Sequence, residues 1–197
     1  MPADPSGQEP TRTLRAVPPQ QRPLRTRRTA RVLLIDRAER VLLFSDRDPG
    51  VSGVTWWITP GGGIEAGESD VVAAIREVHE ETGLLLDATA LIGPLAARRV
   101  RHGYSDVVIN QHDTFFAAYV DAFEVDTSGH TQEEKITMTA SRWWSRDELA
   151  TTTATIWPAQ LGQLRDAAGE FEDSARTMAQ LPDADESTVS PDLGWAR

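Results

Sequence analysis

A helix predicted at Ser69–Thr82 is the feature that most constrains how this chain can fold. Pro60 and the glycines at 61–63 come directly before it, and glycine tolerates loop angles that other residues avoid. Ser69 fits the N-cap position and Gly83 the position that ends the helix. On a helical wheel one stripe is apolar and is expected to be buried; it consists of Val71, Ala74, Ile75 and Val78.

The other face of this helix carries three glutamates, Glu77, Glu80 and Glu81. Glu77 and Glu81 form an i,i+4 like-charge pair, which costs a few tenths of a kcal/mol. All three lie toward the C-terminal end, where the helix dipole disfavours anions. Such a conflict is expected where function overrides stability, and a Mg²⁺ ion bound by carboxylate oxygens would resolve it. The helix alone leaves a solvated acidic face as the alternative.

Short apolar runs on both sides of the helix predict strands. We expect a hairpin from 29–35 and 40–44, and further strands in 56–58, 84–101, 107–123 and 142–145. A last helix is predicted at Trp157–Ala168. The order of strands, helix, strands and helix indicates an α+β protein, or an α/β/α sandwich around a mixed sheet.

The chain of 197 residues suits one domain with loose ends. We expect a disordered leader at 1–27, rich in proline and arginine, the folded domain at 28–168, and an acidic, largely disordered tail at 169–197. The net charge is −10, although residues 1–31 hold seven arginines against two acids. An acidic body argues against nucleic acid as a partner and would repel a phosphate substrate unless a cation intervened.

Composition excludes several classes of protein. The chain has no cysteine, so it has no disulfide framework, thiolate metal site or cysteine nucleophile. It has no run of about 18 apolar residues that could span a membrane, and its start lacks the apolar stretch of a signal peptide. We therefore expect a cytoplasmic protein with no membrane partner, and leave a homodimer open.

The spacing of glycine, glutamate and arginine residues around the helix matches a known family pattern. The matching positions are Gly62, Glu68, Arg76, Glu77, Val78, Glu80, Glu81, Gly83 and Leu84. This segment, Gly62–Leu84, resembles the Nudix box, GX5EX7REUXEEXGU, in which U is a bulky aliphatic residue. Every specified position matches, and a chance match in a chain of this length is on the order of 10⁻⁷.

The resemblance implies a Nudix-type α/β/α sandwich over roughly 29–168, whose loop and helix bind Mg²⁺ or Mn²⁺. It also implies a small-molecule substrate of the nucleotide class, a nucleoside diphosphate linked to a moiety X, and hydrolysis of its phosphoanhydride bond. By position, Glu80 and Glu81 match the main metal ligands and Glu77 a further ligand. The carbonyl of Gly61 matches a backbone ligand in some members. Arg76 matches the residue that orients the glutamates, and Glu68 one that braces the loop.

Candidates outside the box are less constrained. Glu133 and Glu134 precede the late strand, where many members carry a catalytic base or an extra ligand, and we favour Glu133. Arg98 and Arg99, with Arg101 and His102, could clamp phosphate or ribose, but side chains alternate along a strand, so not all of them can face the site. Trp157 is our candidate for stacking a nucleobase, although core packing is the commoner role of tryptophan.

The sequence leaves the substrate open. Subfamily signatures place a proline or tyrosine some 15–18 residues past the box, where this chain holds Arg99–His102. Neither the ADP-ribose nor the diadenosine polyphosphate signature fits. A non-catalytic nucleotide-binding module of the same fold is the alternative function, but such modules usually lose box glutamates. A diphosphate isomerase of this fold is a further possibility, but its chemistry typically uses a cysteine, and this chain has none.

Overall fold

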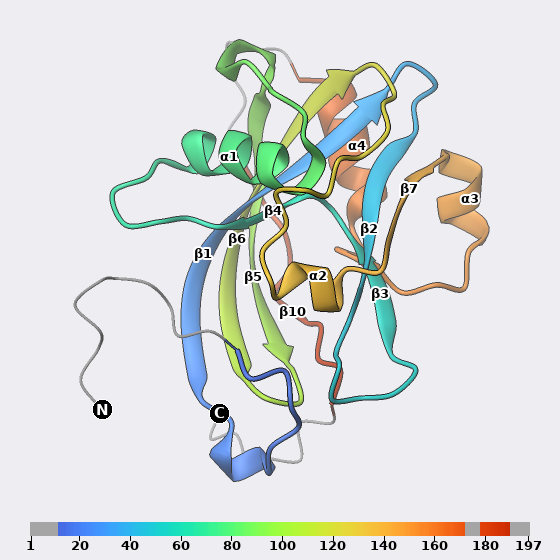
Figure 1. Ribbon diagram of the computed structural model, residues 1–197. Helices are drawn as coiled ribbons and strands as arrows, with labels where there is room; N and C mark the ends of the chain where they lie inside the picture. Colours follow the sequence, from blue (N-terminus) through green and yellow to red (C-terminus); the bar gives the residue numbers. More distant parts are fainter. Residues whose placement is uncertain (1–11, 172–177, 190–197) are drawn as a thin grey trace.

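The computed structural model describes residues 12–171 and 178–189, which form one curled sheet with helices on both sides (Figure 1). The strands are β1 (Leu24–Asp36), β2 (Val41–Arg47), β3 (Thr55–Ile58), β4 (Gly61–Gly63), β5 (Ile92–Gly103), β6 (Val108–Val120), β7 (Ala140–Trp144), β8 (Ile156–Trp157), β9 (Ala179–Gln180) and β10 (Ala184–Asp185). The helices are α1 (Asp70–Thr82), α2 (Glu134–Thr137), α3 (Arg146–Thr151) and α4 (Leu161–Gly169), with 3-10 turns η1 (Pro19–Gln21) and η2 (Ala88–Ala90).

The sheet is mixed. Its order is β10-β5-β6-β1-β2-β3-β8, with β4 paired to β1, β7 to β2 and β9 to β5. β1 runs parallel to β6 along its whole length, from Leu24 opposite Val108 to Asp36 opposite Val120. The β1–β2 and β5–β6 pairs are antiparallel. The predicted hairpin and the α+β class with a mixed sheet are confirmed.

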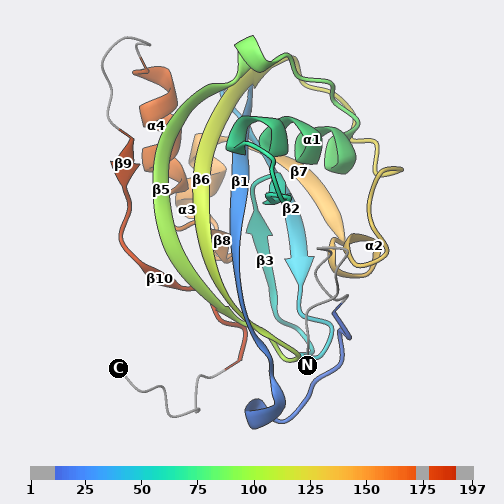
Figure 2. The same ribbon diagram turned by 90° about the vertical axis from the view of Figure 1, so that its left-hand side faces the viewer.

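Alternate side chains of β1 enter two different cores. Ala30, Val32 and Leu34 pack with the buried face of α1 on one side. Leu33 and Ile35 pack with α4 on the other side. Because strand side chains alternate, one strand supplies both cores and the sheet lies between two helical layers (Figure 2).

Helix α1 begins and ends as its sequence predicts. The Ser69 hydroxyl accepts a 3.3 Å hydrogen bond from the amide of Val72, and Gly83 adopts φ 74° at the C-terminal end. The buried face differs from the expected stripe: Val71 is 36% exposed, and Ala73 is buried instead. Glu81 lies seven residues after Ala74 and so projects in nearly the same direction, and the helix is turned so that Glu77 and Glu81 are buried beside Ala74.

The glycines at 61–63 form a strand rather than the expected loop. They pair antiparallel with Thr29–Arg31 of β1 and so anchor the start of the box to the centre of the sheet. Gly61 has φ 125°, and a Cβ there would lie 2.1 Å from the Ala30 carbonyl oxygen, so only glycine fits.

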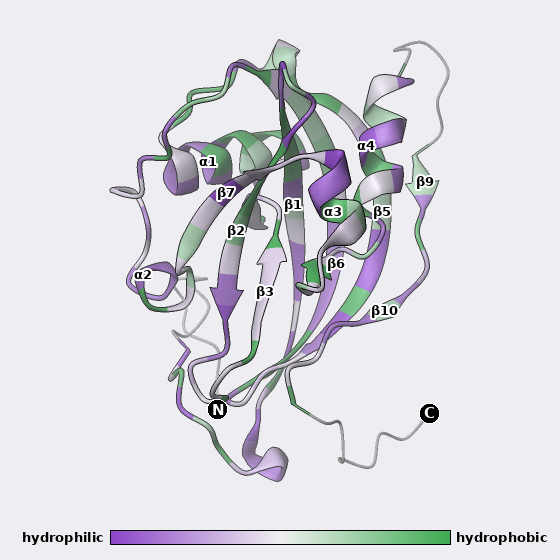
Figure 3. Cartoon of the chain, turned by 90° about the vertical axis from the view of Figure 1, so that its right-hand side faces the viewer, coloured by the Kyte–Doolittle hydropathy of each residue, from purple (hydrophilic) through white to green (hydrophobic). Residues whose placement is uncertain are grey.

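The lower half of the strands is more polar than the upper half. Figure 3 shows the apolar stretches of the strands between α1 and α4 and the polar stretches beyond them. β1 follows this division, with the polar stretch 25–29 preceding 30–35, which is apolar except for Arg31. A third hydrophobic cluster is mostly aromatic. It includes Phe44, Trp56, Ile58, Tyr104 and Trp157.

Parts of the two expected loose ends pack against the domain. Residues 1–11 and 190–197 of the predicted tails lie outside the described residues, as do 172–177. Within the described chain, the amide of Val17 donates to the Ser105 carbonyl at 3.0 Å, and β1 already begins at Leu24. Residues 178–189 run along β5 as β9 and β10, with Glu186 6% exposed. Composition did not reveal these contacts, because their partners are distant in sequence.

None of the helices in the described part of the chain is long and apolar enough to cross a membrane.

Candidate active site

Three glutamates from two separate helices meet beside the start of the box. One carboxylate oxygen from each of Glu77, Glu81 and Glu134 lies within 4.8 Å of the other two. Glu77 and Glu81 are 7% and 1% exposed, and Glu134 is partly buried. The i,i+4 spacing places the first two on one side of α1. We call these three residues the carboxylate cluster.

The carboxylate cluster is electrostatically unfavourable by itself. Burial raises the pKa of Glu81 well above its ordinary value, and the charge of Glu77 raises it further despite the opposing charge of Arg31. Burial also raises the pKa of Glu77, although Arg76 opposes this effect. Desolvated acids that repel one another are stable as anions only beside positive charge, so the cluster has the electrostatics of a cation site.

The backbone of Gly61 joins this cluster to the sheet. Its amide donates a 2.8 Å hydrogen bond to Oε2 of Glu81, which fixes that side chain. Its carbonyl, the expected backbone ligand, accepts a 2.5 Å hydrogen bond from Nη1 of Arg31. The Gly61 backbone therefore contacts both Glu81 and Arg31, a guanidinium group that sequence reasoning did not identify.

Arg76 connects the helix to the loop before it. Nε and Nη2 each donate at 2.9 Å to the Glu68 carboxylate. Nη2 also donates to the carbonyl of Gly63 at 2.8 Å, and Nη1 reaches Glu77 at 2.8 Å and Glu80 at 3.0 Å. This geometry is the bracing arrangement that the resemblance implies for Arg76 and Glu68.

Glu80 is placed differently from the two other box glutamates. Its side chain is 46% exposed and paired with Arg76, and it is outside the carboxylate cluster. In this arrangement Glu77 and Glu81 lie together, and the metal-ligand role of Glu80 stays a prediction.

Of the two late carboxylates, Glu134 rather than the favoured Glu133 joins the cluster. Oε1 of Glu133 is instead 3.2 Å from Nη1 of Arg12. Oε2 of Glu134 accepts from the amide of Thr131 at 2.7 Å, while the Thr131 hydroxyl accepts from the amide of Glu134 at 3.2 Å. These reciprocal bonds resemble a capping box, and the Thr-x-x-Glu spacing was the sequence signal that separates the two glutamates.

Arg98 is structural. Its guanidinium is 3% exposed and donates to Asp113 at 2.7 Å and to both Glu186 oxygens at 2.5 and 2.9 Å. With these donors engaged, Arg98 is not available to clamp a substrate phosphate. The expectation of a phosphate contact is not met, because the C-terminal segment supplies the anion.

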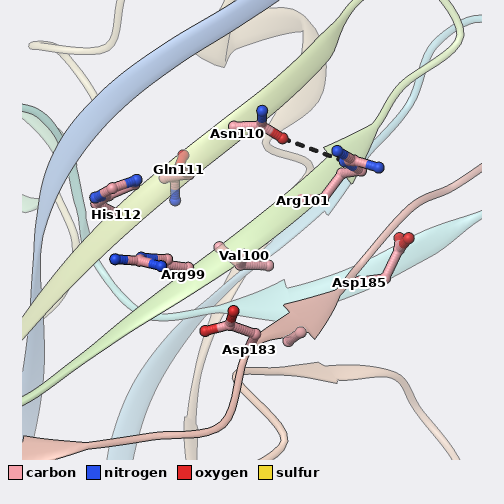
Figure 4. A pocket seen from close by; sticks show the side chains of 9 residues that line it. Arg99, Val100, Arg101, Asn110, Gln111, His112, Asp183 and Asp185 are labelled. Carbon is pink, nitrogen blue, oxygen red and sulfur yellow. Dashed lines mark hydrogen bonds between the residues drawn. The ribbon is translucent and has the colours of Figure 1, made fainter. Parts of the chain in front are cut away.

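Arg99 points to the opposite side of β5, as strand alternation requires. It lines a surface hollow of about 350 Å³ together with Arg101, His112 and Asp183, among others (Figure 4). No member of the carboxylate cluster lines this hollow. Arg99 is therefore separate from the glutamates with which the sequence prediction grouped it.

Trp157 packs in the core. It is 8% exposed and stacks on Trp56, with ring centroids 4.5 Å apart. The ring of His102 lies 5.4 Å from it. Because neighbouring rings cover Trp157, the expected nucleobase contact is not met, and packing is its role in this structure.

A sequence model of the NUDIX domain matches residues 25–164, which contain the complete box and the whole carboxylate cluster. The chain belongs to the NUDIX domain family. This assignment agrees with the mixed curled sheet and with the complete box on β4 and α1.

Individual relatives of this NUDIX chain are distant. A putative 8-oxo-dGTP diphosphatase of Bacillus subtilis (strain 168) is 38% identical over 62 residues, which are 32% of this chain and 38% of that relative. The chain thus matches well under half of the relative's length. The structure of the E. coli dihydroneopterin triphosphate pyrophosphohydrolase is 20% identical, with TM-score 0.50 over 73% of this chain and 93% of that one. A MutT protein from Methanosarcina mazei Go1 has TM-score 0.49 and 18% identity over 76% and 96% of the two chains.

Sequence reasoning missed three basic residues that contact Gly61, the box or the segment leading into α2. Arg31 lies in an apolar strand and contacts Gly61, and no local pattern marks it. A ring nitrogen of His130 is 2.9 Å from the carbonyl oxygen of Glu81. Arg12 lies in the segment expected to be disordered. All three reach the site through contacts that are long-range in sequence.

Proposed function

We propose that this chain is a hydrolase that cleaves, with a divalent cation, a phosphoanhydride bond in a nucleoside diphosphate linked to another group. The observation that carries the proposal is the carboxylate cluster of Glu77, Glu81 and Glu134. A fold under selection for stability alone would not bring three carboxylates within 4.8 Å of one another in a buried site. The complete box and the NUDIX domain supply the reaction class.

The donor set fits Mg²⁺ or Mn²⁺. Both ions prefer oxygen ligands, and the site offers three carboxylates, one of which is hydrogen-bonded to the Gly61 amide. Glu77, Glu81 and Glu134 would hold the ion. A bound divalent cation neutralises diphosphate charge and lowers the pKa of a bound water molecule.

The chain's own residues prepare this site. Arg76 holds Glu77 from one side, and the Gly61 amide holds Glu81 from the other. Arg31 places a positive charge at the buried end, where it also lowers the cost of ionising Glu81. The ligands are thereby fixed before a substrate binds, which is the main contribution that a protein makes to phosphoryl transfer.

The test is turnover by the purified full chain. Mg²⁺ or Mn²⁺ would be supplied with nucleoside triphosphates, oxidised nucleotides, ADP-ribose, NADH and dinucleoside polyphosphates. The name of the Bacillus relative places an oxidised deoxynucleoside triphosphate first in this panel. We expect hydrolysis of at least one member and none without a divalent cation.

Matched variants locate the activity. Glu81→Gln and Glu134→Gln keep the size of each side chain and should lower kcat/KM by more than about a hundredfold, since even residues that only support metal ligands cost 10–100-fold. Glu124→Gln, at an exposed glutamate, should behave like the unchanged protein. Unchanged turnover in both cluster variants would contradict the assignment. Substrate binding without turnover by the unchanged protein would favour the non-catalytic nucleotide-binding module. A cytoplasmic location and a homodimer stay predictions.

A further inference from the structure

The segment 12–17 crosses the polar end of the domain close to α2 (Figure 2). We call it the N-terminal strap. The amide of Leu14 donates to Oδ2 of Asp106 at 3.0 Å, and the amide of Val17 donates to the Ser105 carbonyl at 3.0 Å. The strap lies outside the residues that match the NUDIX domain, so the shared domain does not account for its contacts.

Arg12 is the residue through which the strap reaches the interior. Its side chain is 12% exposed, and Nη2 and Nε donate to Asp106 at 2.7 and 3.4 Å. The guanidinium carbon lies 4.4 Å from the centre of the Tyr104 ring. Nη1 donates to Oε1 of Glu133 at 3.2 Å. One side chain thus joins the loop after β5 to the segment that leads into α2.

The α2 segment depends on such contacts for its position. It is a single turn, Glu134–Thr137, and one isolated helical turn is not stable in water. Its described anchors from outside include a 3.0 Å hydrogen bond from Arg47 to the Ile136 carbonyl and the ion pair between Arg12 and Glu133. The second anchor acts next to Glu134, the member of the carboxylate cluster that α2 supplies.

We propose that Arg12 is a positioning residue for the carboxylate cluster: by holding Glu133 it fixes the turn that places Glu134 beside Glu77 and Glu81. This inference rests on the proposed function for its consequence, but its structural content is independent of turnover. The strap then completes a cation site whose other two carboxylates belong to the box. Asp106 and Tyr104 keep the Arg12 guanidinium in place, so its geometry does not depend on Glu133 alone.

A different role for the same contacts has the opposite consequence. Arg12 covers one face of Tyr104, so the strap could act as a barrier to substrate. Removing a barrier raises turnover, whereas removing a positioning contact lowers it. The two roles therefore separate in one experiment.

The test compares Arg12→Ala with Arg15→Ala, which alters an exposed arginine of the same strap. Amide hydrogen exchange at 131–137 is measured in the metal-free full chain, and Mn²⁺ affinity by titration without substrate. For Arg12→Ala we expect faster exchange at 131–137 and about fivefold weaker Mn²⁺ binding, the size expected for one partly exposed ion pair. Arg15→Ala should match the unchanged protein in both measurements.

Glu133→Gln provides a second route to the same contact. It weakens the link to α2 and leaves the contacts of Arg12 with Asp106 in place, so it avoids a general loss of the strap. We expect the same direction of change in exchange and in Mn²⁺ binding. Turnover should fall in both variants and be partly recovered at high Mn²⁺, a recovery that loss of a catalytic group would not show.

Exchange at 131–137 decides the inference. Rates equal to those of Arg15→Ala would overturn it, as would higher turnover with unchanged Mn²⁺ affinity, which would make the strap a barrier. If the unchanged protein bound no Mn²⁺, the proposed function would fail, and the exchange comparison would still decide whether Arg12 orders the turn.

Discussion

The carboxylate of Glu77 occupies the space that a side chain at Gly62 would need. A Cβ built at Gly62 would lie 2.5 Å from Oε2 and 2.7 Å from Cδ of Glu77. A Cβ at the next residue, Gly63, would meet nothing within 4 Å. A side chain at Gly62 would therefore have to push the Glu77 carboxylate aside, because that carboxylate packs directly on the Gly62 backbone.

Replacing Gly62 by alanine should displace Glu77 from the carboxylate cluster. We expect kcat/KM and Mn²⁺ affinity to fall by at least about tenfold, the effect typical of disturbing a ligand's support. Gly63→Ala should stay close to the unchanged protein. Steady-state kinetics and Mn²⁺ titration of both variants check the prediction. Equal losses in the two would show that loop flexibility, rather than the contact with Glu77, matters.

Glu81→Gln should separate stability from activity. It removes charge repulsion from the cluster and keeps an acceptor for the Gly61 amide. The free energy of unfolding of the metal-free variant should therefore equal that of the metal-free unchanged protein or exceed it by up to about 1 kcal/mol. Saturating Mg²⁺ should stabilise the unchanged protein far more than the variant, because binding to the folded state adds its own free energy. Urea unfolding with and without Mg²⁺ measures both. A metal-free variant that is clearly less stable would mean that the Glu81 charge stabilises the fold.

The sequence predicted those parts of the site that are encoded locally. The helix ends, the box spacing and the bracing role of Arg76 all depend on residues close together in the chain. The expected stripe included Val71 because it was drawn through hydrophobic residues alone, whereas the fold turns α1 so that Glu77 and Glu81 are buried. Periodicity describes a helix in water and does not register a polar site beneath it.

The remaining errors come from contacts between distant segments. Glu133 was favoured over Glu134, but Arg12, over a hundred residues away in sequence, binds Glu133. Arg98 was expected to meet a phosphate, and Glu186 of the C-terminal segment meets it instead. Single-sequence patterns carry no information on such pairings, so basic residues near the box could not be sorted into structural and functional groups.

Glu186→Ala should destabilise the protein through Arg98. The variant removes the anion that receives two hydrogen bonds from a buried guanidinium, and breaking such a pair from one side costs about 3 kcal/mol. Asp113 still binds the Arg98 guanidinium in this variant, so part of its buried charge stays neutralised. Asp183→Ala, at an exposed acid of the same segment, should change the free energy of unfolding by no more than about 0.5 kcal/mol. Urea unfolding of the pair tests this, and similar values for both would show that the C-terminal segment adds little to the fold.

His102 should make the folded protein sensitive to mild acid. Its ring is 1% exposed and lies 5.6 Å from the Tyr104 ring, and burial lowers its pKa to about 3. In the unfolded chain the His102 ring binds a proton near pH 6.5, whereas in the folded protein it stays neutral at that pH. Unfolding is therefore favoured as the pH falls below 6.5.

Between pH 7 and pH 5 the contribution of His102 amounts to a loss of about 2 kcal/mol in the free energy of unfolding. His102→Gln should remove this part of the pH dependence, whatever its effect on stability at neutral pH. His112→Gln, at an exposed histidine, should keep it. Denaturant unfolding of the three proteins at several pH values isolates the difference, because the carboxylates titrate in all of them. If the unchanged protein and His102→Gln have parallel curves, His102 must become protonated within the fold, and the aromatic cluster around it would have to admit a charged ring.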